Sequence, residues 1–220
     1  MGKVLYLGTD IEHFSSKLEV IHYPVIRIQE RGLEQLEIYE AFLKLPQFTH
    51  ILCTSKHTVQ ILCRYAKEIF SDPYPFLHRK CLAIGNVTQE HLRRRGIEPL
   101  WKSQEERQEG ILPFLEKISL DAYVFYPRSS KARLLLQRYL QQKKIACEVL
   151  DLYHTTLQKI EPVPSLEEVE EIMFTSPSTV EGFFQIFSEI PPGKKISFQG
   201  KVTRDFFQQK IDRLQKIRIF

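Results

Sequence analysis

The chain carries one motif twice, as Ile51-Leu-Cys-Thr-Ser-Lys-His-Thr-Val59 and as Ile172-Met-Phe-Thr-Ser-Pro-Ser-Thr-Val180. Ile, Thr, Ser, Thr and Val are identical at matching positions of the two copies. A weaker match follows at a similar distance in both halves, where Gly85-Asn-Val-Thr-Gln-Glu90 corresponds to Gly200-Lys-Val-Thr-Arg-Asp205. Two matches in the same order indicate an ancient duplication, so we expect two halves of related structure.

Each copy of the motif predicts a strand, a tight turn and a helix. A short β-prone run precedes the first turn, and apolar residues recur at helical spacing after it. Ser55 is a good N-cap, and Ser176 is its counterpart, followed by Pro177 at the first helical position. Asn86 and Gln89 predict a capping box for a further helix.

A third strand–helix unit is predicted between the two copies. We expect a strand over Tyr123–Tyr126, a polar turn over Pro127–Arg133, a helix over Leu134–Gln142 and a strand over Cys147–Tyr153. The segment Lys102–Gly110 is expected to be a solvated surface loop.

The N-terminus has a reduced version of the same unit. Strands are expected at Val4–Leu7 and Tyr23–Ile28, with a polar turn and a short helical stretch between them. Strands that alternate with helices imply parallel sheets and right-handed crossovers. The pattern therefore predicts two α/β domains with flavodoxin-like architecture.

Composition excludes several classes of protein. With 43% hydrophobic and 26% charged residues the chain is an ordinary globular protein rather than a disordered one. No apolar run approaches the ~20 residues that span a bilayer, and the N-terminus has no secretory h-region. A net charge of +4 without a basic run interleaved with aromatics argues against a nucleic-acid partner. We expect a soluble cytoplasmic protein.

Metal and nucleotide signatures are missing from the sequence. The four cysteines include no CxxC pair, and the seven histidines lack metal-ligand spacing, so buried reduced thiols and no metal are expected. The chain has no GxGxxG or Walker loop, which disfavours dinucleotides and nucleoside triphosphates. It also lacks the G-x-S-x-G elbow of many hydrolases.

Hydroxyl and cationic side chains cluster at the predicted strand-to-helix turns. Ligands of open α/β sheets bind beyond the carboxyl ends of the strands, where helix N-termini present free N–H groups. Such groups suit carboxylates or phosphates. A single Ser or Thr there is more often only a helix cap. The candidate binding residues are Thr54, Ser55, Lys56, Thr88, Arg128, Ser129, Lys131, Thr175, Ser176, Ser178, Lys201 and Thr203.

The chain resembles the uroporphyrinogen-III synthase family at these turns. The resemblance is carried by Thr54-Ser55 after a strand, Ala83-Ile-Gly-Asn-Val-Thr88, Val149-Leu-Asp-Leu-Tyr-His-Thr155, Phe174-Thr-Ser-Pro-Ser-Thr-Val180 and the early Tyr23-Pro-Val-Ile26. These pieces run in family order over nearly the whole chain.

The resemblance implies a domain arrangement that periodicity does not. The second domain is inserted into the first, so residues 1–28 and 158–220 would form one α/β domain and 29–157 the other. Two antiparallel connecting strands, over Tyr23–Ile28 and Cys147–Leu157, would serve as a hinge.

The resemblance also implies an activity without a cofactor. The substrate is hydroxymethylbilane, a linear tetrapyrrole with eight carboxylates, which is cyclised with inversion of one ring. A monomer is expected, and a transient contact with hydroxymethylbilane synthase is left open. Tyr153 matches the family tyrosine that assists departure of the substrate hydroxyl. The alternative for Tyr153 is an aromatic packed on a hinge strand, and the alternative for Arg128 and Lys131 is a solvated helix start.

Two departures from the family pattern keep other functions open. The first turn, Gly8-Thr-Asp10, lacks the usual Arg, and the last turn reads Gln199-Gly-Lys-Val-Thr203 where the family has an aliphatic-Gly-Pro-Thr-Thr pattern. A non-catalytic two-lobed protein that binds a small polyanion would explain the repeat equally well. A flavin oxidoreductase has a compatible fold but no phosphate-loop signature here.

Overall fold

The computed structural model describes residues 2–11, 14–78, 80–103, 105 and 107–217. The chain divides into two units, Met1–Ile28 with Thr155–Phe220 and Gln29–His154. We call them the first and the second unit. The sequence places these boundaries at 28/29 and 157/158. That the units are hinged domains stays a prediction.

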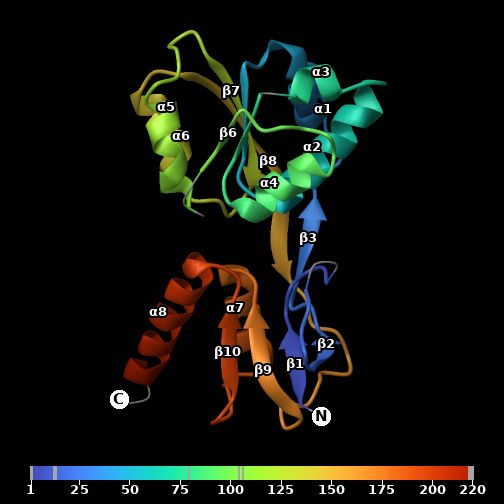
Figure 1. Ribbon diagram of the computed structural model, residues 1–220, viewed down its shortest axis with the longest axis vertical. Coiled ribbons are helices and arrows are strands. Elements are labelled where there is room, and N and C mark those ends of the chain that lie inside the picture. Colours follow the sequence, from blue (N-terminus) through green and yellow to red (C-terminus); the bar gives the residue numbers. More distant parts are fainter. Residues whose placement is uncertain (1, 12–13, 79, 104, 106, 218–220) are drawn as a thin grey trace. The chain divides into compact units, whose positions relative to one another are not determined.

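The first unit is built on a four-stranded parallel sheet with the strand order β10-β9-β1-β2 (Figure 1). Helices α7 and α8 pack against each other beside it. If the four strands are numbered 1 to 4 in chain order and the sheet is read from β2, the order is 2-1-3-4, a pattern of doubly wound sheets. The elements are β1 (Lys3–Tyr6), β2 (Glu19–His22), β9 (Val169–Phe174), α7 (Pro177–Ile186), β10 (Lys195–Phe198) and α8 (Lys201–Ile217).

The second unit contains parallel strands in the order β8-β7-β4-β5-β6, and β4 is therefore central. Two parallel sheets flanked by helices confirm the predicted α/β class. The elements are α1 (Leu36–Leu43), η1 (Leu45–Gln47), β4 (His50–Cys53), α2 (Lys56–Ile69), α3 (Tyr74–Leu77), β5 (Cys81–Ala83), α4 (Asn86–Arg93), β6 (Trp101–Lys102), η2 (Gln108–Ile111), α5 (Leu112–Leu115), β7 (Tyr123–Ser129), α6 (Leu135–Gln142) and β8 (Ala146–Leu157).

Strand β3 (Ile26–Glu30) lies beside β8 at the edge of the larger sheet. The Arg31 amide donates to the Leu152 carbonyl at 2.8 Å, and the Gln158 amide donates to the Val25 carbonyl at 2.9 Å. From the first of these bonds to the second, the residue number falls from 31 to 25 on the side of β3 and rises from 152 to 158 on the side of β8. The two strands are therefore antiparallel. The chain passes between the two units through these strands.

The repeated motifs adopt the same local structure in both units. Ser55 and Ser176 are the N-caps of α2 and α7, and each side chain accepts a hydrogen bond from the backbone three residues on. Gly85 and Gly200, which precede α4 and α8, have positive φ angles of 81° and 87°. Such angles strongly favour glycine, which explains why both copies keep it.

Two local predictions were wrong, and one strand is shifted from its predicted bounds. The N-cap of α4 is Gly85 and makes no side-chain bond, so Asn86 is the first helical residue rather than the cap. Among the described residues between Gly8 and Leu18 no helix occurs, and the β-branched pair Val20-Ile21 forms β2 instead. The strand predicted over Tyr23–Ile28 begins only at Ile26, because Pro24 cannot donate to a ladder.

The polar turn predicted over Pro127–Arg133 begins later than expected, because β7 continues to Ser129 and the turn follows at Ser130 and Lys131. Pro127 is tolerated there because the paired part of β4 and β7 covers only His50–Val124 and Ile51–Phe125. On the other side β7 pairs with β8 along its whole length. The residues after Tyr126 are therefore held by the sheet instead of by solvent.

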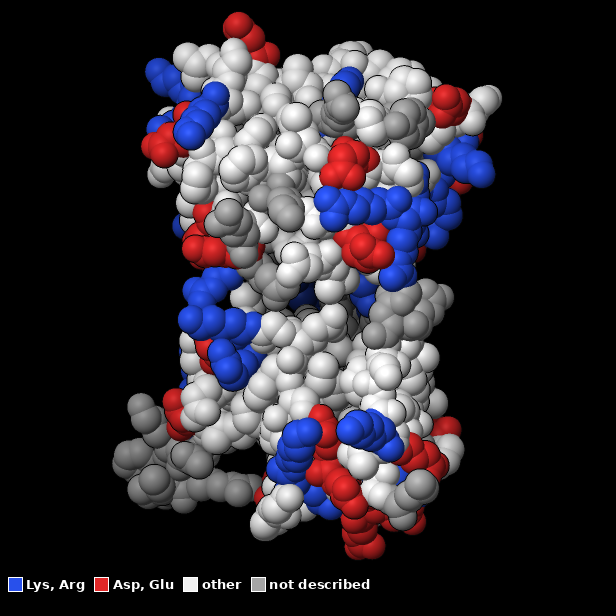
Figure 2. Space-filling view, viewed as in Figure 1, with Lys and Arg blue, Asp and Glu red and all other residues white. Residues whose placement is uncertain are grey.

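Figure 2 shows basic and acidic side chains interspersed on the visible face of each unit. None of the described helices is both long and apolar enough to cross a membrane.

Candidate functional site

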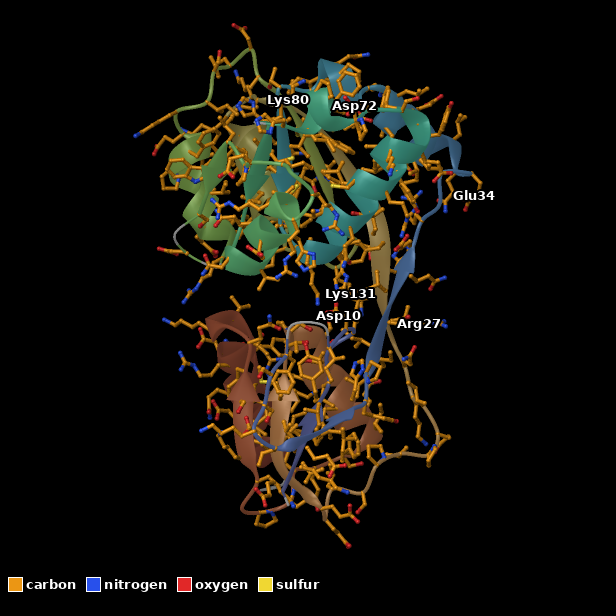
Figure 3. All side chains as sticks on the ribbon, turned by 45° about the vertical axis from the view of Figure 1, so that its right-hand side comes forward. Asp10, Arg27, Glu34, Asp72, Lys80 and Lys131 are labelled. Atoms are coloured by element: carbon orange, nitrogen blue, oxygen red, sulfur yellow. The ribbon has the colours of Figure 1, made fainter. Side chains whose placement is uncertain are left out.

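The candidate residues of the second unit gather at the C-terminal edge of its sheet. Parallel strands end at a common edge, so the turn after β4, the start of α4 and the ends of β7 and β8 converge there. Figure 3 shows Lys131, which follows β7, at the opposite edge of this unit from Lys80, which precedes β5. Lys131 is exposed, whereas Thr88 is buried.

Tyr153 on β8 is the buried centre of this edge. Its side chain is only 5% exposed, and its hydroxyl lies 2.8 Å from Ser55 Oγ. Burial raises the pKa of Tyr153, while the hydroxyls of Ser55, Thr58 and Ser129 act in the opposite direction. A neutral phenol within a chain of hydroxyls can donate a proton or hydrogen bond to a bound molecule.

A bulge sets which side chains face Tyr153. The register of β7 and β8 shifts between Arg128 and Ser129, so Asp151 opposes Arg128 and Tyr153 opposes Ser129, which leaves Leu152 as the extra residue. Bulges commonly re-aim side chains next to functional sites.

Ser55 links helix capping to the tyrosine. Its Oγ accepts from the Thr58 amide at 3.1 Å and lies 3.0 Å from the Thr58 hydroxyl. Thr58 is fully buried. The same serine therefore holds the start of α2 and contacts the Tyr153 phenol.

We expect Ser55→Ala to lower the free energy of unfolding by about 1 kcal/mol, the typical value of an N-cap. Urea unfolding followed by circular dichroism measures the loss. Ser71→Ala, at an exposed bend, is the control and should change stability by less than about 0.5 kcal/mol. Equal stabilities of the two variants would contradict the capping role.

Arg128 is not the solvated residue that the alternative interpretation expected. It is 8% exposed, and its Nε donates to Asp151 Oδ1 at 2.9 Å. Its buried Nη1 has no hydrogen-bond partner among the described residues. The pairing with Asp151 offsets the cost of burying the guanidinium, and Nη1 can still donate to a ligand.

The sequence predicts a solvated surface loop over Lys102–Gly110. The structure shows that part of this segment packs against the rest of the second unit. Gln108 Nε2 donates to the Tyr126 hydroxyl at 3.2 Å, and Glu109 makes two hydrogen bonds with Arg133 at 2.7 and 2.8 Å. The Arg133 guanidinium lowers the pKa of Glu109 to about 2. Ser103 is buried. The charged residues of this stretch led to the prediction that it is solvent-exposed, but the Gln108 side chain bonds to the buried Tyr126.

Sequence reasoning missed Tyr126 and Asp151. Tyr126 is fully buried, and the Arg128 guanidinium carbon lies 5.7 Å from the centre of its ring. Burial raises the pKa of Tyr126 to about 12, while Arg128 and the Thr54 side chain act against the rise. Because Tyr126 lies in an apolar run, its sequence context predicted only an ordinary core residue.

The candidate residues of the first unit occupy the equivalent edge of its own sheet. The turn after β9 precedes α7, and the turn after β10 precedes α8. Thr203 is 2% exposed, and its hydroxyl donates to the Gln199 carbonyl at 3.1 Å. Lys201 is exposed, and Thr175, Ser176 and Ser178 are half-buried.

Thr179 already uses two backbone amides that we had expected to bind a ligand. Its hydroxyl accepts from the amides of Thr175 and Ser176, each at 3.1 Å, and donates to the Ser176 carbonyl at 2.7 Å. The α7 turn is therefore stabilised by its own threonine. Ligand binding there would depend more on side-chain hydroxyls.

Aromatic residues that the sequence had not singled out lie around the turn after β1. The Tyr6 ring stacks on Phe14 with centroids 4.5 Å apart, and burial raises the pKa of Tyr6 to about 12. His22 Nε2 lies 2.8 Å from the Gly8 carbonyl oxygen. A Cβ at Gly8 would lie 2.7 Å from the Tyr6 ring, so a larger residue there would have to displace the end of the Tyr6 side chain.

The described residues contain no group of three or more His, Cys, Asp or Glu side chains arranged to hold a metal ion. The cysteines at 53, 63, 81 and 147 are free thiols.

Comparison with known proteins points to one family. A model of the family described as uroporphyrinogen-III synthase HemD matches residues 14–211. The chain is 25% identical over 179 residues to the porphyrin biosynthesis protein HemD of Ruminiclostridium josui, covering 79% of this chain and 35% of that protein. It is 27% identical over 177 residues to a protein of Methanothermobacter thermautotrophicus named for uroporphyrinogen-III synthase, covering 74% of this chain and 66% of that one. The chain thus spans about a third of the first relative and just under two thirds of the second.

Solved structures share the fold. A uroporphyrinogen III synthase of the extremely thermophilic bacterium Thermus thermophilus superposes with a TM-score of 0.66 at 19% identity, covering 95% of this chain and 89% of that one. The uroporphyrinogen-III synthetase of Helicobacter pylori gives 0.62 at 17% identity, covering 96% and 89%. At these identities the likeness concerns the fold alone.

Proposed function

The chain belongs to the uroporphyrinogen-III synthase HemD family, and from this premise we propose that it cyclises hydroxymethylbilane to uroporphyrinogen III with inversion of the D ring. The match over residues 14–211 is the observation that carries the proposal. The buried phenol of Tyr153 beside Ser55 supports it, because dehydration of the bilane calls for a proton donor without a metal.

In this proposal the turns of each unit bind carboxylates of the substrate. Thr54, Ser55, Thr88 and Ser129 provide hydroxyls in the second unit, with Lys56, Arg128 and Lys131 as cations. Thr175, Ser176, Ser178 and Thr203 provide hydroxyls in the first unit, with Lys201 as a cation. The Arg128 Nη1, buried and without a partner among the described residues, supports this role, since it can donate to a carboxylate oxygen.

Tyr153 acts at the first chemical step. The hydroxymethyl C–O bond breaks as the phenol donates a proton to the departing hydroxyl, which leaves as water. The pyrrole nitrogen supplies the electron pair for the new exocyclic double bond. Loss of the pyrrole N–H proton gives the neutral azafulvene and balances the proton that Tyr153 gave.

Ring inversion then depends on geometry. The substituted carbon of the far ring attacks the azafulvene methylene and forms a spiro intermediate. The bond from that carbon to its original methylene breaks, and the methylene rejoins the ring at the free carbon. Loss of a ring proton restores the pyrrole. The bilane also closes unaided without inversion, so the protein's task is to position the far ring.

The test supplies hydroxymethylbilane as it forms and resolves the product isomers. Hydroxymethylbilane synthase generates the bilane from porphobilinogen in the presence of this protein. Chromatography then separates the oxidised type I and type III uroporphyrins. Type III product is the expected result. Type I alone, formed at the unaided rate, would reject the proposal, and saturable binding without turnover would favour the polyanion-binding alternative.

We expect Thr88→Val to raise KM about two- to tenfold and leave kcat nearly unchanged, because one hydrogen bond among many is lost. Steady-state kinetics with the coupled supply of bilane gives both constants. Thermal unfolding controls for stability, since Thr88 is buried. Complete loss of activity in a folded Thr88→Val protein would contradict distributed carboxylate binding.

A further inference from the structure

Tyr126 connects three parts of the second unit although it is remote from solvent. It lies on β7, which is flanked by β4 and β8, and its side chain is fully buried. A phenol that cannot reach solvent acts on a ligand only through its neighbours. The neighbours therefore decide its role.

Two of those neighbours belong to the proposed carboxylate-binding set. The Arg128 guanidinium carbon lies 5.7 Å from the ring centroid, within the range of a cation–π contact. The Thr54 side chain acts against the rise in the pKa of the Tyr126 phenol that burial causes, as a hydrogen-bond donor to the phenol oxygen does. Tyr126 thus connects the turn after β4, which contains Thr54, with the end of β7, which contains Arg128.

The third neighbour is the segment around η2. Gln108 Nε2 donates to the Tyr126 hydroxyl at 3.2 Å, and the buried Gln108 Oε1 has no partner among the described residues. Arg133 pairs with the adjacent Glu109, which pins the same segment. The phenol oxygen accepts from Gln108, and the Thr54 side chain, which acts against the rise in the phenol pKa, is a second donor to the same oxygen, so Tyr126 orients the Thr54 hydroxyl.

Resting on the proposed function, we propose that Tyr126 is a positioning residue that holds the Thr54 hydroxyl and the Arg128 guanidinium in place for substrate carboxylates. The ring orients Arg128, and the hydroxyl orients Thr54. Because Tyr126 itself does not touch substrate, its loss changes binding more than the chemical step. Gln108 supports Tyr126 in this task.

The first experiment compares Tyr126→Phe with the wild-type enzyme in the isomer-resolved assay. The variant keeps the ring beneath Arg128 and removes only the hydroxyl. KM is expected to rise about three- to tenfold with kcat unchanged within about twofold, the effect of losing one hydrogen bond. Tyr123→Phe is the matched control. It removes another hydroxyl from β7, one that donates to Glu148 at 2.8 Å at the far end of the strand, and should leave both constants unchanged.

A double-mutant cycle separates positioning from general destabilisation. If Tyr126 acts through Thr54, then Thr54→Val combined with Tyr126→Phe should raise KM no more than Thr54→Val alone. Additive effects on KM would overturn the proposal, as would an unchanged KM in Tyr126→Phe. Gln108→Met leaves Tyr126 itself unchanged and should also raise KM. It replaces Tyr126→Phe in the experiment if that variant does not fold.

The wild-type measurement distinguishes the two levels of the proposal. Wild-type protein that makes no type III product rejects the proposed function itself. Wild-type protein that is active, beside a Tyr126→Phe variant with normal KM, rejects only the role of Tyr126.

Discussion

Replacement of Tyr153 by Phe is expected to lower kcat about a hundredfold or more, the usual contribution of a general acid. The phenol is 5% exposed and lies within hydrogen-bond distance of Ser55, and in the proposed mechanism it gives its proton to the departing hydroxyl. Quenched-flow or steady-state assays with freshly generated bilane measure the loss. The type III fraction of the remaining product shows whether geometry survives.

The control for this variant is Tyr139→Phe on α6, a half-buried tyrosine away from the strand edge. It should retain normal turnover. Thermal unfolding of both variants shows whether Tyr153→Phe remains folded. Near-normal kcat in folded Tyr153→Phe would remove the phenol from the mechanism and leave it as an aromatic packed on a connecting strand.

The raised pKa of Tyr153 predicts how activity responds to pH. The proton-donating form is the neutral phenol, and burial keeps it neutral above the ordinary tyrosine pKa of 10.0. Ionisation of Tyr153 should therefore cause no decline in kcat as pH approaches that value. A decline there that disappears in Tyr153→Phe would show that the phenol ionises as an exposed tyrosine does.

The second large effect concerns stability. We expect Phe174→Ala to lower the free energy of unfolding by about 3–5 kcal/mol, the range for truncating a buried phenylalanine. Phe174 is fully buried at the end of β9, and its ring lies within 5.3 to 6.0 Å of the rings of Phe183, Phe198 and Phe207. Its removal leaves a cavity shared by β9, β10, α7 and α8.

Denaturant unfolding of Phe174→Ala and Phe174→Leu tests this expectation. The leucine variant keeps most of the apolar volume and should lose clearly less stability than the alanine variant. Because Phe174 directly precedes the Thr175-Ser176 turn, loosening of the cavity should also weaken substrate binding. A loss below about 1 kcal/mol in Phe174→Ala would show that the aromatic cluster can collapse around the gap.

Local sequence was informative wherever a residue acts on its immediate neighbours. Ser55 and Ser176 were predicted as N-caps and are N-caps, because capping joins a side chain to an amide three residues away. The paired Gly85 and Gly200 likewise keep positive φ in both copies. The duplicated motifs therefore predicted the two α/β units.

Local sequence failed where a distant strand decides the outcome. Pro127 suggested a turn, but pairing with β8 extends β7 through it. Charges in Lys102–Gly110 suggested solvent, but Gln108 bonds to Tyr126 eighteen residues later. In both cases the competing interaction is tertiary, and no local pattern encodes it.

The amino-acid order by itself determined the duplicated strand–turn–helix units, the placement of hydroxyls at helix starts and the family to which the chain belongs. Only the tertiary structure decided that Arg128 is buried against Asp151, that a bulge sets Tyr153 opposite Ser129, and that the Tyr126 ring lies beside the Arg128 guanidinium. Caps, turns and periodic apolar faces depend on residues a few positions apart. Burial, strand register and contacts between elements depend on residues brought together only when the sheet forms.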